Sequence, residues 1–189
     1  MGEVNIIIGL SGVGKGTVLE QAMLITDEDY KVINYGDRMV EIAKDQRLVD
    51  SRDDLKKLDT ETNKQLQKDA AESIFDDAED NDVIVETHAA IQTPFGYLPG
   101  LPKWTLENLE PSKIIMLRAE PKAIYERTLE DDSRDREHEE VEQIEEYQEV
   151  AREMASTGAV LTGAYLSVIE NPDGHAEQAA EDLIEVLRG

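Results

Sequence analysis

A glycine-rich segment near the start of the chain has the residue types and spacing that bind phosphate. It reads Gly9-Leu10-Ser11-Gly12-Val13-Gly14-Lys15-Gly16-Thr17. The glycines let backbone N–H groups converge on phosphate oxygens with no Cβ in the way. Lys15 adds a positive charge for the outer phosphates, and Thr17 adds a hydroxyl one place later than the general pattern has it. A turn that only joins a strand to a helix is the alternative, but the sequence favours a nucleotide-binding P-loop.

Two further groups of residues have side chains suited to phosphate chemistry. Glu86 ends an apolar run, at a place where a carboxylate holds Mg²⁺ or its waters beside the phosphates. Arg127, Arg134 and Arg136 cluster around a charged break at 131–137, where arginines can close over a moving phosphoryl group. The alternatives are a strand-end acid in an acidic protein and a solvated loop with local ion pairs.

No residue stands out as a general base. His88 follows Glu86 closely, but a lone histidine after a strand is more often a structural residue. An alcohol acceptor profits from a base, whereas a phosphate acceptor is already an anionic nucleophile. The sequence therefore favours a nucleotide acceptor over a hydroxyl acceptor.

Short apolar runs that alternate with helical patterns must position these residues. We expect strands at about 4–8, 30–35, 83–88, 112–118 and 165–169, and helices at about 15–23, 38–43, 60–78, 105–109, 121–129, 139–156 and 176–187. The alternation predicts an α/β fold: a five-stranded parallel sheet of the P-loop NTPase type, with helices on both faces and a short lid. The candidate residues then meet at the carboxyl ends of the strands.

Two local expectations follow from turn chemistry. Gly36-Asp37 should end the second strand, with Asp37 capping the helix that follows. Thr93–Pro102 holds three prolines and two glycines in ten residues, and we expect no regular structure there.

The composition of the chain limits its environment and partners. It has 189 residues and no cysteine, which excludes disulfides and thiol nucleophiles. There is no apolar run long enough to span a membrane and no secretory signal, so we expect a cytoplasmic protein. With 43 acidic and 19 basic residues the net charge is −24, which disfavours nucleic acid and anionic membranes as partners. The acidity indicates either an ordinary solvated surface or, as we favour, adaptation to multimolar salt.

Several segments together resemble a known family. The loop ending Gly14-Lys15-Gly16-Thr17 is similar to that of adenylate kinases. Other segments resemble the archaeal type of adenylate kinase along essentially the whole chain: Val32–Asp37, Arg52-Asp53, Lys57–Asp59, Val85–His88, Thr93–Pro102, Ser133–Arg136 and Val160–Ala164. The acidity resembles that of a member from a halophilic archaeon. Ser11 departs from the family pattern, which usually has proline at that position.

The resemblance implies reversible phosphoryl transfer from ATP to AMP, giving two ADP, with Mg²⁺. It implies one P-loop kinase domain over 1–189, with an AMP-binding helical region at about 37–64 and a lid at about 128–138. A homotrimer is also implied. The implied ATP and catalytic residues are Gly9 to Thr17, Arg127, Arg134 and Arg136, and the implied Mg²⁺ residues are Thr17 and Glu86, the latter through water. The residues expected to bind AMP are Asp37, Arg38, Arg52, Thr87, His88, Gly96 and Tyr97. A kinase of another nucleoside monophosphate or small metabolite, or an ATP-binding switch without catalysis, is the alternative.

Overall fold

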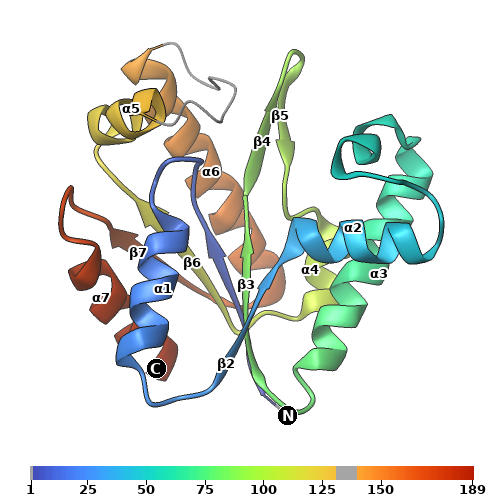
Figure 1. Ribbon diagram of the computed structural model, residues 1–189, viewed down its shortest axis with the longest axis horizontal. Coiled ribbons are helices and arrows are strands. Elements are labelled where there is room, and N and C mark those ends of the chain that lie inside the picture. Colours follow the sequence, from blue (N-terminus) through green and yellow to red (C-terminus); the bar gives the residue numbers. More distant parts are fainter. Residues whose placement is uncertain (1, 131–139) are drawn as a thin grey trace.

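The computed structural model describes residues 2–130 and 140–189, and a five-stranded parallel sheet lies at its centre (Figure 1). The strand order is β2-β3-β1-β6-β7. The strands are β1 (Val4–Ile8), β2 (Tyr30–Asn34), β3 (Asp82–Thr87), β6 (Lys113–Arg118) and β7 (Tyr165–Glu170). All five predicted strands are present, and the predicted fold class is confirmed.

The central strand is apolar because both of its faces are covered. Every residue of β1 is buried, and Ile6 pairs with Val85 on one side and Ile114 on the other. A strand with helices on both faces has no side that favours polar residues, so it carries a continuous apolar run. This run delivers the chain directly into the glycine-rich segment at the carboxyl end of the sheet.

Helices form a layer on each face of the sheet (Figure 1). On one face α1 packs against α7; on the other, α4 bridges α3 and α6, and α2 packs on α3. The helices are α1 (Lys15–Ile25), α2 (Tyr35–Asp45), the 3₁₀ helix η1 (Arg52–Lys57), α3 (Thr60–Asp77), α4 (Lys103–Leu109), α5 (Pro121–Glu130), α6 (Val141–Thr162) and α7 (Ala176–Arg188). Within the described ranges, no helix is long and apolar enough to cross a membrane.

The expectation of irregular structure at Thr93–Pro102 is wrong, because part of this segment forms an antiparallel hairpin. Its strands are β4 (Ala90–Thr93) and β5 (Gly96–Pro99). Pro94 lies in the two-residue turn, Pro99 ends β5, and Pro102 caps α4, so no proline lies inside the ladder. The hairpin rises above the carboxyl edge of the sheet (Figure 1).

The expected cap of α2 is also wrong by three residues. The helix begins at Tyr35, and the side chain of Asn34 accepts a hydrogen bond from the backbone N–H of Asp37 at 3.1 Å. Asparagine caps a helix as well as aspartate does, so the helix starts at the earlier residue. Gly36 and Asp37 consequently lie in the first turn of α2, and Asn34 is held beside the end of β3.

Candidate active site

The glycine-rich segment connects β1 to α1 and surrounds the side chain of Lys15. Gly12 and Gly14 have φ angles of +82° and +95°, which glycine adopts without strain. Lys15 is the first residue of α1 and is buried; its Nζ donates to the backbone oxygens of Gly9 at 2.8 Å and Leu10 at 3.4 Å. The loop thus holds an ammonium group at the N-terminus of a helix, where anions bind.

The loop is held from outside by two side chains that converge on one carbonyl. Nδ2 of Asn171 donates to the oxygen of Val13 at 2.8 Å, and Nη1 of Arg127 donates to the same oxygen at 3.2 Å. Arg127 also pairs with Asp173 at 2.9 Å. Asn171 and Asp173 belong to the turn that follows β7, and Arg127 lies on α5, so two separate elements fix this side of the loop.

His88 follows β3 and points back to the start of the loop. Its Nδ1 lies 3.0 Å from the backbone oxygen of Gly9, which can only accept, so Nδ1 carries the proton and Nε2 is left as an acceptor. His88 is exposed as a whole residue, but it lines a concave part of the surface. Burial, reinforced by the charge of Lys15, lowers the pKa of His88 to about 4. The imidazole is therefore neutral at pH 7.

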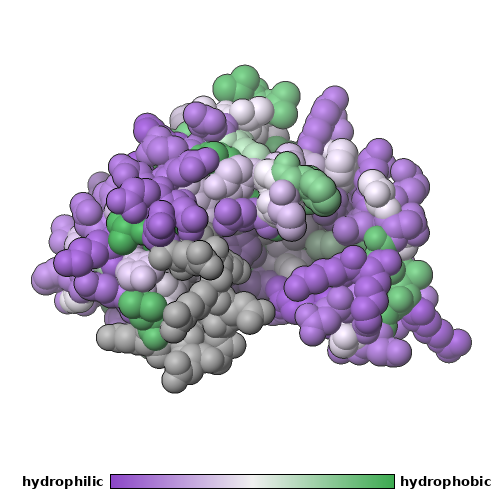
Figure 2. Space-filling model, turned by 90° about the horizontal axis from the view of Figure 1, so that it is seen from above, coloured by the Kyte–Doolittle hydropathy of each residue, from purple (hydrophilic) through white to green (hydrophobic). Residues whose placement is uncertain are grey.

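Two cavities meet at Lys15. One, of about 380 Å³, lies over the P-loop and is lined by Leu10–Gly12, Gly14–Thr17, Glu86, His88 and Arg127. The other, of about 280 Å³, is enclosed by the α2, η1 and α3 side; its walls include Lys15, Asn34, Gly36, Arg52, Lys56, Glu86, Thr87 and His88. Viewed onto the carboxyl edge of the sheet, the surface is largely hydrophilic and hollowed between two lobes (Figure 2).

The two arginines expected to bind AMP lie in different surroundings. Arg52 lines the second cavity and forms an ion pair with Asp37. Arg38 does not line it, because its guanidinium donates to Ser73 at 2.7 Å and to Asp77 at 2.8 Å on α3. The structure brings Arg52 to the candidate site and leaves Arg38 joining two helices.

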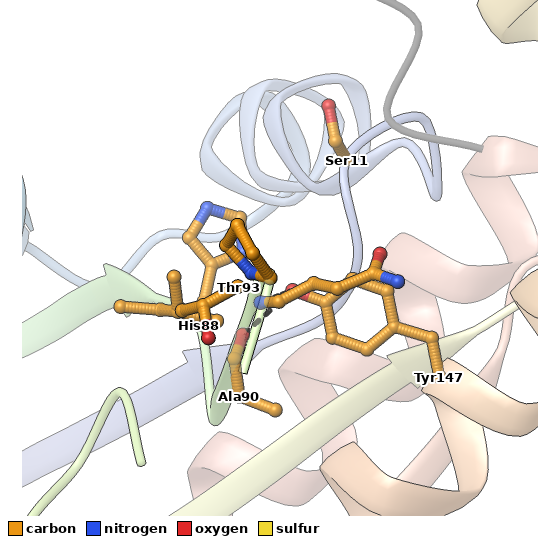
Figure 3. A pocket seen from close by; sticks show the side chains of 8 residues that line it. Ser11, His88, Ala90, Thr93 and Tyr147 are labelled. Atoms are coloured by element: carbon orange, nitrogen blue, oxygen red, sulfur yellow. Dashed lines mark hydrogen bonds between the residues drawn. The ribbon is translucent and has the colours of Figure 1, made fainter. Parts of the chain in front are cut away.

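The hairpin residues lie beside a third cavity of about 460 Å³. Ser11, His88, residues 90–94 and Tyr147 line it. Figure 3 shows Tyr147 with its hydroxyl close to Ala90, and the hydrogen bond to the Ala90 carbonyl is 2.8 Å long. Gly96 and Tyr97 line none of the three cavities; Tyr97 packs against Tyr147 with ring centroids 5.2 Å apart. Arg134, Arg136 and most of the expected lid lie outside the described residues.

The oxygen-bearing side chains around the first cavity are suitable ligands for Mg²⁺. Glu86 and Thr17 both line it and offer a carboxylate and a hydroxyl. Mg²⁺ prefers oxygen ligands and usually keeps several waters, so one carboxylate beside substrate phosphates is enough to hold it. Nδ2 of Asn34 donates to Glu86 at 3.4 Å and orients the carboxylate. The described residues contain no cluster of three or more His, Cys, Asp or Glu side chains suited to a metal.

Comparison with known proteins identifies the family. The adenylate kinase of Methanopyrus kandleri is 42% identical over 190 residues, covering 100% of this chain and 99% of its own. That of Methanocaldococcus jannaschii is 43% identical over 189 residues, covering 98% of each chain. The chain belongs to the adenylate kinase family. A family model described as an AAA domain matches residues 8–145 of this adenylate kinase family member.

Solved structures agree on the fold of this adenylate kinase family member. Shikimate kinase from Bacteroides thetaiotaomicron has a TM-score of 0.59 at 14% identity, covering 99% of both chains. Shikimate kinase from Acinetobacter baumannii, in complex with shikimate, has a TM-score of 0.54 at 15% identity, covering 100% of this chain and 94% of that one. These likenesses show the fold alone.

Sequence reasoning missed two residues that shape the site in this adenylate kinase family member. Asn34 both caps α2 and contacts Glu86, and Asn171 holds the P-loop. Asn171 belongs to a turn, Asn171–Gly174, that follows the last strand at the carboxyl edge of the sheet. The position of Asn171 directly after a strand was the one sequence feature that could have indicated a role at the site. Its partner, the backbone oxygen of Val13, lies 158 residues away and cannot be inferred from the sequence.

Proposed function

We propose that this protein catalyses reversible phosphoryl transfer between ATP and AMP, giving two ADP. One observation carries the proposal: Lys15, Glu86 and His88 line both the P-loop cavity and the cavity of the α2–α3 side. A phosphoryl-donor nucleotide bound on the P-loop and an acceptor nucleotide bound in the second cavity would place their phosphates on the two sides of the Lys15 ammonium group. Membership in the adenylate kinase family supports the same reaction.

The residues of the P-loop would bind and orient the donor. Backbone N–H groups of Gly12 to Thr17 receive the phosphates, and Lys15 moves from the Gly9 carbonyl to the outer phosphates. Glu86 and Thr17 would hold Mg²⁺, which when bound neutralises charge on the β- and γ-phosphates. Arg127 stays beside the loop and adds positive charge at its α5 side.

The second cavity would orient the acceptor. Arg52 and Lys56 supply cationic groups for the AMP phosphate, beside Thr87 and the neutral His88. An anionic phosphate oxygen needs no base, so His88 serves as a neutral hydrogen-bonding group. Gly96 and Tyr97 belong to the hairpin that borders the third cavity, and we assign them to the AMP side. Asp37 orients Arg52 through its ion pair.

Further parts of the proposal rest on the sequence. Arg134 and Arg136 would close a lid at about 128–138 over the phosphates and exclude water. The helical region at about 37–64 would bind AMP, within one P-loop kinase domain over 1–189. We also propose a cytoplasmic homotrimer without nucleic-acid or membrane partners. Adaptation to the salt of a halophilic archaeon is supported by the net charge of −24.

The test is ADP formation from MgATP with AMP, UMP, CMP, GMP or no acceptor, in about 3 M KCl to screen the acidic surface. We expect turnover with AMP. Lys15→Met should abolish turnover and leave the chain folded, because it removes the ammonium and keeps an unbranched side chain. Turnover with another monophosphate, and not with AMP, would keep the reaction type but show that the acceptor is a different nucleotide. ATP binding without any acceptor-dependent turnover would favour a switch, and an active Lys15→Met would refute the assigned role.

A further inference from the structure

The side-chain amide of Asn34 is oriented by a neighbour at each end. Its Oδ1 accepts from the backbone N–H of Asp37 at 3.1 Å, and that N–H can only donate. Its Nδ2 therefore faces the other way and donates to Oε2 of Glu86, a carboxylate oxygen that accepts. The usual ambiguity between amide oxygen and nitrogen does not arise, because both partners require the same orientation. One amide thus joins the first turn of α2 to the end of β3.

The sheet and the helix together determine where this amide lies. Asn34 is the last residue of β2, and it pairs with Glu86 across the parallel β2–β3 ladder. The same residue is the N-cap of α2. The sheet therefore sets the backbone of Asn34, and the helix sets its side-chain oxygen. As a result, the position of Nδ2 beside Glu86 depends on where the first turn of α2 lies.

The first turn of α2 also contacts a cation of the acceptor cavity. Arg52 forms an ion pair with Asp37. A Cβ added at Gly36 would lie 2.5 Å from Nη2 of Arg52 and 3.3 Å from Oδ1 of Asn34. Because Gly36 has no side chain, the guanidinium lies close to the backbone of this turn, next to the capping amide. Asn34, Gly36, Arg52 and Glu86 all line the cavity of the α2–α3 side.

Glu86 links this cavity to the residues suited to Mg²⁺. It also lines the cavity over the P-loop, where it and Thr17 would hold Mg²⁺. Its contact with Asn34 is 3.4 Å, which is long for a hydrogen bond. Hydrogen bonds at reaction sites are often long before substrates bind and tighten in the complex. An anion that binds Arg52 at the first turn of α2, or a cation that fixes the Glu86 carboxylate, would shorten this same bond.

We propose that Asn34 is a positioning residue that couples the acceptor cavity to the carboxylate of the Mg²⁺ site. This inference rests on the proposed function, since it names how the two substrate sites of that reaction are linked. An acceptor phosphate bound at Arg52 fixes the first turn of α2, and Asn34 then holds Glu86 in one orientation. Coupling between binding sites is reciprocal, so the affinity for the acceptor rises by the same factor when the donor binds with Mg²⁺.

The test is AMP binding by titration calorimetry, with and without the β,γ-imido analogue of ATP, which cannot transfer its phosphoryl group. In the wild-type protein we expect the analogue with Mg²⁺ to lower the Kd of AMP at least about fivefold. Asn34→Ser keeps a capping side chain for α2 but removes the donor to Glu86. The factor should then fall below about twofold, because the bond that carries the coupling is lost.

The dependence on Mg²⁺ separates positioning from a structural role. With a chelator in place of Mg²⁺, Asn34→Ser and the wild-type protein should bind AMP with Kd values within about twofold of each other, whereas a damaged α2 would weaken binding under both conditions. Asn81→Ser is the matched control, since it removes an amide that donates to Asp77 just before the other end of β3. It should keep the wild-type factor. In a Glu86→Gln background, adding Asn34→Ser should change the factor no further.

One comparison needs no variant and keeps the proposal testable if Asn34→Ser does not fold. In the wild-type protein the analogue should lower the Kd of AMP with Mg²⁺ and change it less than about twofold with the chelator. The same factor under both conditions, or an unchanged factor in folded Asn34→Ser, would overturn the inference. A wild-type protein that does not bind AMP, or that binds AMP and MgATP without phosphorylating AMP, would instead refute the proposed function and the inference with it.

Discussion

Gly14 and Asn171 provide a quantitative test of how the P-loop is held. A Cβ added at Gly14 would lie 2.5 Å from Nδ2 of Asn171, and the backbone there has a φ of +95°. Gly14→Ala therefore combines left-handed strain of about 1–2 kcal/mol with a steric overlap of about 1–3 kcal/mol. Asn171→Ala alone removes the bond to the Val13 oxygen, about 1 kcal/mol, since Arg127 still donates to that oxygen.

The double variant separates the two effects. Without Asn171 the new methyl group has space, and only the backbone strain remains. We therefore expect the double variant to be about 1–3 kcal/mol more stable than the sum of the single changes predicts. Urea unfolding at constant KCl measures the four free energies of unfolding. Gly16→Ala is the control: nothing lies within 4 Å of its added Cβ, and alanine stabilises a helix by about 0.5–1 kcal/mol. Costs at Gly14 and Asn171 that add within about 0.5 kcal/mol would refute the reasoning.

Three other predictions concern acid, a buried hydroxyl and salt. Because the folded pKa of His88, about 4, lies below the usual 6.5, its contribution is intact above pH 6.5 and is lost as the pH falls toward 4. Between pH 7 and 4.5 the wild-type protein should therefore lose about 1–2 kcal/mol more free energy of unfolding than His88→Asn, a magnitude reduced because His88 is exposed as a residue. Urea unfolding at the two pH values measures this difference, and equal losses in the two proteins would contradict the prediction. Tyr35→Phe should cost about 1–2 kcal/mol by removing the buried hydrogen bond from the Tyr35 hydroxyl to the Gln67 carbonyl. Thermal unfolding measures this cost, with Tyr165→Phe on the exposed edge strand as the control. Activity and circular dichroism should both decline below about 1 M KCl; full activity in dilute buffer would contradict salt adaptation.

The sequence by itself determined the sheet and the nucleotide loop. Buried parallel strands have continuous apolar runs, and the P-loop is a local pattern whose glycines and lysine act within one strand-to-helix connection. All five strands were predicted to within one residue at each end, and the order of the predicted helices was correct, because these patterns depend on neighbours in the chain. The resemblance added the family, which the comparisons confirm.

Only the tertiary structure decided which side chains share a cavity. Asn34, and not Asp37, caps α2, because the helix begins at Tyr35. The hairpin forms because its prolines lie at the turn and at the end of a strand, where no ladder hydrogen bond is lost. Arg38 resembled a phosphate-binding residue by its place in the chain, yet α3 offers it Asp77 and Ser73. The orientation of Gln67 depends on Trp104, 37 residues away. Contacts of this kind depend on how helices pack, and no local pattern in the sequence encodes them.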